Sequence, residues 1–195
     1  MILRSQAAAG RRPVDCSPTS KGIKPMRYTA ASKWSKERFT IDDEAGTPKL
    51  EVRRIYGVDG NSLLLQNLEG KELAAIRPRT SPTRFEIAIG ANQPITVRHR
   101  GWFGRRYSID TPVGEMTATV GDFSREGYEL TSSGAARATV SRQFIRQQNI
   151  TIDVADDADA VSLIAVVVAI ETLRDDRREA QNSIPYVRLL LRLVN

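Results

Sequence analysis

The most apolar run in the chain is "AVSLIAVVVAI", residues 160–170. Eleven residues of helix cover about 17 Å, whereas the hydrocarbon core of a bilayer is about 30 Å thick. Extending the run to Leu173 adds Glu171 and still falls short of a membrane span. Because a helix that is apolar on every face needs protein around it, the run predicts a buried core helix. Its predicted core residues are Val161, Leu163, Ile164, Val167, Val168 and Ile170.

The chain between residues 27 and 154 repeats one pattern. An alternating apolar segment leads to a short turn that closes on glycine, and a second alternating segment then ends in valine or isoleucine. Alternation with period two around a tight glycine turn predicts a β-hairpin. Four clear copies begin at Phe39, Leu63, Tyr107 and Tyr128, with turn glycines Gly46, Gly70, Gly114 and Gly134. A looser copy begins at Phe85, and the strand "NITIDV" precedes the apolar run.

About a dozen short strands followed by one apolar helix predict a mainly β fold, a closed antiparallel barrel with the helix threaded through it. A closed barrel has no free sheet edges, but its interior has to be filled. The helix can be apolar all round because the barrel surrounds it. The carboxylates that precede it are expected to cap its N-terminus and oppose its dipole: Asp156, Asp157 and Asp159.

The domain organisation follows from length and charge. A chain of 195 residues suits one domain. We expect a disordered tail over residues 1–26, a barrel domain over 27–179 and an extension over 180–195. The tail holds five basic residues and one acidic residue of a chain whose net charge is +6. The barrel is therefore nearly balanced in charge, and basicity alone does not indicate a polyanionic partner.

Several segments resemble, in order, the pattern of LURP-one-related proteins, which belong to the tubby-like superfamily with the tubby C-terminal domain and the phospholipid scramblases. These segments are "FTIDDEAG", "NLEGKELAAI", "FEIAI", "GDFSREGYEL", "ARATVSRQ" and "ITIDVADDADAVSLIAVVVAIETLRDD", within residues 27–176. The resemblance implies a twelve-stranded barrel around a central hydrophobic helix. It implies function less directly: tubby domains bind phosphoinositides and scramblases act at membranes. The N-terminal tail and the segment after Glu179 lie outside it.

The residues that usually carry catalysis are scarce. His99 is the single histidine and Cys16 the single cysteine, which lies in the tail. This removes histidine-based triads and His/Cys zinc sites within the chain, and it excludes an intramolecular disulfide. The acidic segment 153–160 lacks the glycine and terminal glutamate of an EF-hand, so helix capping is favoured over calcium binding. We expect no enzyme, no cofactor and no metal.

A basic and aromatic end of the barrel is the candidate binding site. Successive turns of an up-and-down barrel fall on alternate ends, and one end collects segments rich in arginine with interleaved aromatics. The densest of them is "RHRGWFGRR", residues 98–106. Arginine pairs with phosphate, and tryptophan enters the membrane interface. The predicted ligand-binding residues are Arg98, His99, Arg100, Trp102, Arg105 and Arg106.

Three interpretations of this end stay open. It binds anionic phospholipid headgroups or another anion, which places the protein in the cytoplasm and at the inner face of the membrane as a peripheral protein. Alternatively, the arginines are ordinary solvated strand ends, with Trp102 and Phe103 covering the barrel mouth. Nucleic acid is the least favoured ligand.

A different class of function is a protein-interaction scaffold without lipid binding, which recruits a partner through the C-terminal segment "IPYVRLLLRLVN". This segment suits docking on the outside of the barrel better than an interfacial membrane helix. Intrinsic lipid scrambling is disfavoured because the apolar helix is needed inside the barrel.

Overall fold

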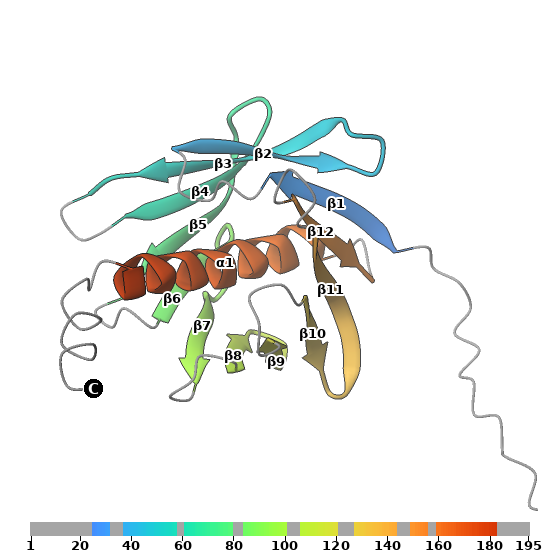
Figure 1. The fold of residues 1–195 in the computed structure, drawn as a ribbon, viewed down its shortest axis with the longest axis vertical. Coiled ribbons are helices and arrows are strands. Elements are labelled where there is room, and N and C mark those ends of the chain that lie inside the picture. The colour runs from blue at the N-terminus through green and yellow to red at the C-terminus, as the bar shows by residue number, and fades with distance from the viewer. Residues whose placement is uncertain are drawn as a thin grey trace, which may run out of the picture.

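Twelve strands and one helix make up the described part of the chain in the computed structural model, which covers residues 25–31, 37–57, 61–79, 84–100, 106–120, 127–143, 149–155 and 159–182 (Figure 1). The strands are β1 (Met26–Ala31), β2 (Arg38–Asp43), β3 (Pro48–Ile55), β4 (Ser62–Asn67), β5 (Glu72–Pro78), β6 (Arg84–Ala88), β7 (Ile95–Arg100), β8 (Arg106–Thr111), β9 (Gly114–Val120), β10 (Tyr128–Ser132), β11 (Ala135–Gln143) and β12 (Asn149–Val154). The helix α1 spans Ala160–Asn182.

The strands form one closed antiparallel barrel. Each strand pairs with its neighbours in sequence, and β1 pairs with β12 to close the sheet. The closing register places Tyr28 opposite Ile152 and Ala30 opposite Ile150, all four with buried side chains. The mainly β fold class and the closed twelve-stranded barrel predicted from the sequence are confirmed.

The predicted hairpins form for the predicted reason. All four turn glycines have positive φ, between 75° and 137°, a region that glycine enters without steric cost. Two of the hairpins also share a side-chain hydrogen bond across the turn. The side chain of Asp43 accepts from the backbone N–H of Thr47 at 2.9 Å, and the side chain of Asn67 accepts from the backbone N–H of Lys71 at 2.8 Å. The sequence repeat is therefore a repeat of turn chemistry.

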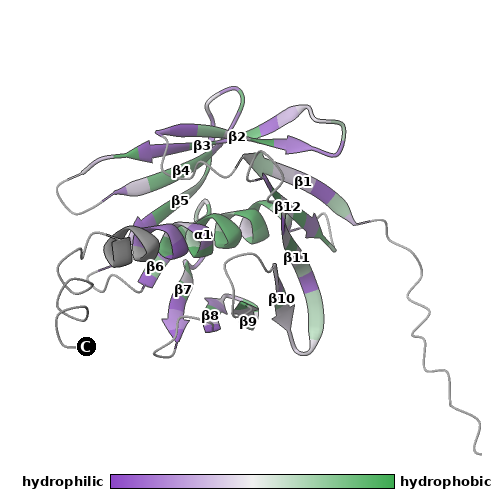
Figure 2. Cartoon of the chain, viewed as in Figure 1, coloured by the Kyte–Doolittle hydropathy of each residue, from purple (hydrophilic) through white to green (hydrophobic). Residues whose placement is uncertain are grey.

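Helix α1 lies inside the barrel. Residues 163–170 are all fully buried, which confirms five of the six predicted core residues in full. Val161 is partly buried and packs against the core. Figure 2 shows the apolar part of α1 beside β12 and a more hydrophilic part further along. In the part of the chain that the structure describes, no helix is both long enough and apolar enough to cross a bilayer.

The barrel has two different ends. We call the end with the tight hairpin turns 44–47, 68–71, 112–113 and 133–134 the turn end, and the end where the odd-numbered strands finish the loop end. Helix α1 begins at the turn end, because it follows β12, and runs toward the loop end. Asp159 directly precedes it, while Asp156 and Asp157 lie outside the described residues.

The domain limits expected from the sequence differ slightly from the observed elements. β1 begins at Met26, one residue before the expected start of the barrel domain, and α1 continues to Asn182, three residues past its expected end. The tail up to residue 24 and the C-terminal segment from residue 183 lie outside the described residues.

Candidate functional site on strands β7 and β8

Three of the six predicted ligand-binding residues lie on the outer face of two neighbouring strands. Ile95 and Val97 of β7 are buried in the core. Since successive side chains of a strand point to opposite faces, Arg98 and Arg100 point outward. On β8, Arg106 lies directly opposite Arg100. The structure thus brings three predicted arginines together on the wall of the barrel, near its loop end.

The arginines also face one another across the strands. Arg98 lies opposite Arg84 of β6, as Arg100 lies opposite Arg106. Like charges directly opposite each other are unfavourable. Arg98 is relieved by an ion pair with Asp110 at 3.1 Å, in which both side chains are nearly half exposed. Neither Arg100 nor Arg106 pairs with a carboxylate of another described residue, and both are exposed.

A shallow hollow of about 280 Å³ lies beside this pair. Its lining combines the two guanidinium groups with hydroxyl side chains and one carboxylate: Arg100, Arg106, Ser108, Thr117, Thr119 and Glu115, with Tyr107 and Ala118. Hydroxyl and guanidinium groups are hydrogen-bond donors, so the hollow suits an oxygen-rich anion. Glu115 is the one acidic group in the lining.

The other three predicted residues do not join this surface. His99 alternates to the inner face, where its ring meets the ring of Tyr107 edge-on, with centroids 5.3 Å apart and planes at 74°. Trp102 and Arg105 lie outside the described residues, as does Phe103. The aromatic part of the predicted site is therefore not tested, and the histidine lies on the opposite face of β7 from the arginines.

A buried charged cluster inside the barrel was missed in the sequence. Glu171 of α1 is fully buried and forms ion pairs with Arg142 of β11 and with Arg174, the latter at 2.9 Å. The guanidinium of Arg174 also lies over the ring of Tyr128, 5.8 Å from its centroid. Two signals could have revealed the cluster. Arg142 continues the inward alternation of Ala138 and Val140, and Glu171 directly follows the apolar run.

Tyr128 in this cluster is unusual in its polar contacts. Its side chain is buried, and its hydroxyl has no hydrogen-bond partner among the described residues. Burial raises the pKa of Tyr128 above its ordinary value of 10.0, although the charges of Arg174 and Arg142 act in the opposite direction. The phenol is therefore neutral around pH 7.

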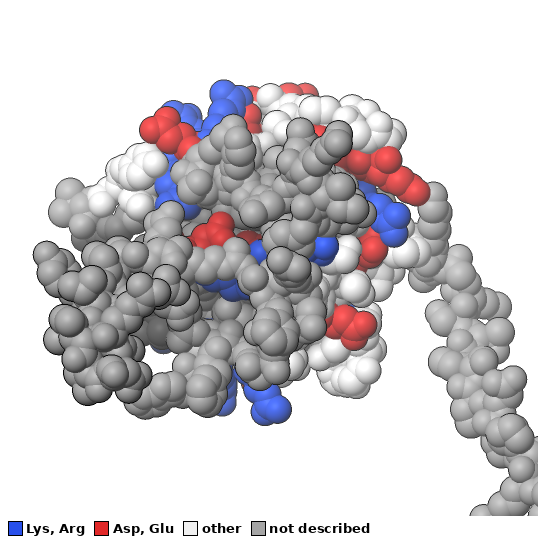
Figure 3. Space-filling model, viewed as in Figure 1, with Lys and Arg blue, Asp and Glu red and all other residues white. Residues whose placement is uncertain are grey.

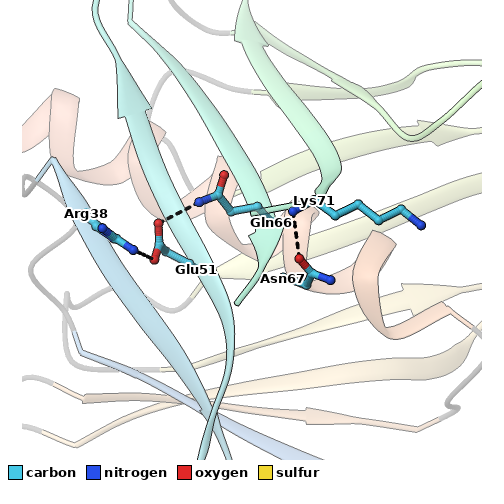
Figure 4. A network of polar contacts seen from close by, with 5 residues as sticks. All are labelled: Arg38, Glu51, Gln66, Asn67 and Lys71. Carbon is cyan, nitrogen blue, oxygen red and sulfur yellow. Dashed lines mark hydrogen bonds and ion pairs between the residues drawn. The ribbon is translucent and has the colours of Figure 1, made fainter. Parts of the chain in front are cut away.

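A second buried carboxylate lies on the outer wall of the β2–β3–β4 sheet. Glu51 is 4% exposed and is held between Arg38 and Gln66, whose side-chain amide donates to it at 2.8 Å (Figure 4). Arg38 lies on β2 and Gln66 on β4, so Glu51 links its strand β3 to both neighbouring strands. The period-two pattern assigned position 51 to the solvent face and gave no sign that it is buried.

On the face drawn in Figure 3, basic and acidic side chains of the described residues lie side by side along the upper part of the molecule. Within the described ranges, no group of three or more His, Cys, Asp or Glu side chains could hold a metal ion.

Taken together, these features define a class: a closed antiparallel barrel that encloses its own C-terminal helix, the tubby-like architecture. The family model of LURP-one-related proteins matches residues 26–171, and the chain belongs to this family. A protein from Arabidopsis thaliana with a known X-ray structure has a similar fold, with a TM-score of 0.50 and 15% sequence identity over 74% of this chain and 89% of that one. At this identity the likeness concerns the fold alone. A comparison with curated proteins found no match.

Proposed function

We propose that this protein is a peripheral binding module that holds anionic phospholipid headgroups on its arginine surface, which we define as Arg84, Arg98, Arg100 and Arg106. In this proposal it acts in the cytoplasm, at the inner face of the membrane, and without a catalytic step. The observation that carries the proposal is the Arg100–Arg106 pair, two exposed cations that face each other beside a hydroxyl-lined hollow.

The physical argument is that an anion removes the repulsion between the two arginines. A phosphate oxygen pair can accept from a guanidinium in a bidentate manner, and a phosphate placed between two guanidiniums is attracted by both. Each basic residue near an anionic membrane contributes about 1 kcal/mol of attraction. The family and fold support this proposal only at the level of a lipid-binding type of domain, so the headgroup is tested directly.

The test compares Arg100→Ser/Arg106→Ser with a charge-matched control, Arg53→Ser/Lys71→Ser. Both control side chains are exposed, Arg53 on β3 and Lys71 in the turn between β4 and β5. Sedimentation with vesicles containing phosphatidylserine should show about 10- to 30-fold weaker binding for the arginine variant. The difference should shrink as salt rises, because exposed charges are screened within about 10 Å at 0.1 M.

Two outcomes would overturn this assignment. Equal losses in both variants would mean diffuse attraction by net charge, and binding by neither variant nor wild type would remove lipid as the ligand. In the latter case the protein-interaction scaffold is the better hypothesis. Melting curves of both variants check that the comparison is made between folded proteins.

A further inference from the structure

A second, larger cavity lies at the opposite end of the barrel. It has a volume of about 650 Å³ and opens between β1, the β2–β3 turn and the first turns of α1. Its floor consists of buried apolar side chains: Tyr28, Leu50, Ala160 and Ile164. Val161, which is partly buried, lies on its helix side. The volume falls within the range of about 300–1,000 Å³ that is usual for small-molecule sites.

The mouth of this cavity, in contrast, is charged and balanced. Its charged lining residues are Arg27, Lys49, Asp43 and Glu44, two of each sign. Lys49 lies 3.4 Å from the carboxylate of Asp43, and Arg27 pairs with Asp153 at 2.7 Å. Hydrogen bonds from the backbone N–H groups of Thr47 and Ala45 help to lower the pKa of Asp43, so its carboxylate stays ionised.

An apolar floor with charges only at the rim is the arrangement that suits an amphiphile. Small-molecule sites are mainly apolar, with a few polar groups that orient the ligand. Burial of a hydrocarbon chain contributes about 0.8 kcal/mol for each CH₂ group. The two basic partners at the rim are more than half exposed, and exposed ion pairs contribute only about 0–1 kcal/mol. A ligand headgroup can therefore rearrange them at little cost.

We infer that this turn-end cavity binds a single-chain zwitterionic lipid with a phosphocholine headgroup. The acyl chain lies against Val161 and Ile164, the phosphate faces Arg27 and Lys49, and the quaternary ammonium faces Asp43 and Glu44. A zwitterion matches the balanced rim, whereas the carboxylate of a fatty acid would also meet the two acidic side chains.

This site is independent of the arginine surface. The turn-end cavity lies where α1 begins, and Arg100 and Arg106 lie toward the loop end. It also differs in chemistry, since it takes a single dispersed lipid and not the surface of an anionic membrane. Failure of one proposal therefore leaves the other standing.

Two adjacent positions of α1 provide a matched pair of variants. Val161 lines the turn-end cavity, while Ser162 lines a different cavity, together with Arg137 and Asp159. Both side chains are partly exposed. Val161→Trp should fill the turn-end cavity, and Ser162→Trp adds the same bulk one residue further on. Lys49→Gln is a third variant, which changes an exposed side chain at the rim.

The experiment is a calorimetric titration of the full chain with lauroyl-lysophosphatidylcholine below its micelle concentration. Wild type and Ser162→Trp should bind alike, and Val161→Trp should bind about tenfold more weakly or not at all, because the indole occupies the space of the chain. Lys49→Gln should weaken binding a few-fold, as expected for the loss of a single exposed charge. It should not change binding of monolauroylglycerol, which has the same chain and no charge.

Three results would overturn the inference. The first is the absence of saturable binding by wild type. The second is an equal loss of lysolipid affinity in Val161→Trp and Ser162→Trp. If Val161→Trp does not fold, unchanged binding of the lysolipid by Lys49→Gln takes its place. The third is tighter binding of laurate than of the lysolipid, which would exclude the zwitterionic headgroup.

Discussion

The two halves of α1 are buried to a similar degree by opposite chemistry. Residues 163–170 are apolar and fully buried against apolar strands. The next turn is polar, yet Glu171 is also fully buried, and Thr172 and Arg174 are less than 10% exposed. We call residues 160–170 the apolar half of α1 and residues 171–174 its charged half; beyond them Asp175 is partly buried and Asp176 is exposed.

The difference shows that position in the barrel, and not hydropathy, decides what is buried. In the apolar half, transfer out of water is favourable for every side chain except that of Ser162, which is partly exposed. In the charged half, each ion loses its hydration and is tolerated because a partner compensates for it. Those partners come from the barrel wall, as Arg142 does, and from the helix itself, where Arg174 pairs with Glu171 at 2.9 Å. The neutral hydroxyl of Thr172 is satisfied separately and donates to the carbonyl of Val168 at 2.8 Å.

The largest effect is expected for a charge in the apolar half. Val167→Asp should unfold the domain, because an unpaired buried charge costs several kcal/mol against a total stability of about 5–15 kcal/mol. Thermal melting of purified protein measures this. Val113→Asp is the control, since Val113 is 93% exposed in a turn. An unchanged melting curve for Val167→Asp would contradict the buried position of α1.

A smaller loss is expected when the charged half loses its carboxylate. Glu171→Gln removes the carboxylate that the buried guanidinium groups of Arg142 and Arg174 share, which should cost about 3–5 kcal/mol. Urea denaturation measures the change, with the exposed Glu129→Gln as control. The double variant Arg142→Met/Glu171→Gln should lose less than the sum of the single variants, because the two residues are in contact. Strict additivity would mean that the pair is not coupled.

A substitution of Tyr128, which lies on barrel strand β10 under the guanidinium of Arg174, probes the surroundings of the charged half. Tyr128→Phe removes a buried hydroxyl that has no partner among the described residues, so it should be neutral or stabilise by about 1 kcal/mol. A loss of more than about 1 kcal/mol would mean that the hydroxyl is bonded in solution.

The same variant carries a pH dependence. Because burial raises the pKa of Tyr128 in the folded state, the unfolded chain releases this proton first as pH rises above 10.0. The folded state then binds more protons than the unfolded state, and stability falls with rising pH. Melting temperatures between pH 9 and 11 should therefore fall less steeply for Tyr128→Phe than for wild type. Parallel curves would contradict the raised pKa.

The smallest effect is expected for the N-terminal tail, where we expect neither apolar nor charged side chains to be buried. Deleting residues 1–25 should leave the melting temperature nearly unchanged, because β1 begins at Met26 and Pro25 is exposed. A fall of about 10 °C would correspond to more than 1 kcal/mol for a domain of this size and would mean that the tail packs on the barrel.

Much of the fold could be predicted because its signals are local. The period-two alternation and the turn glycines lie within single hairpins, so each copy of the repeat specifies its own two strands and their register. The all-apolar run around Val167 required a surrounding shell, and the hairpins supplied it. For the same reason, the arginines of β7 and β8 could be recognised as neighbours from one hairpin.

Only the tertiary structure decided which polar groups meet. Arg142 and Glu171 lie on different elements, and their pairing depends on how far α1 penetrates the barrel. The alternation of apolar and polar residues along β3 predicts that Glu51 points outward. Its burial, however, depends on Arg38 and Gln66 of the neighbouring strands. The turn-end cavity arises in the same way, from the fit between α1 and three strands distant from it in sequence. Hydropathy is a property of each residue, whereas compensation of charge and the shape of a cavity are properties of pairs brought together by the fold.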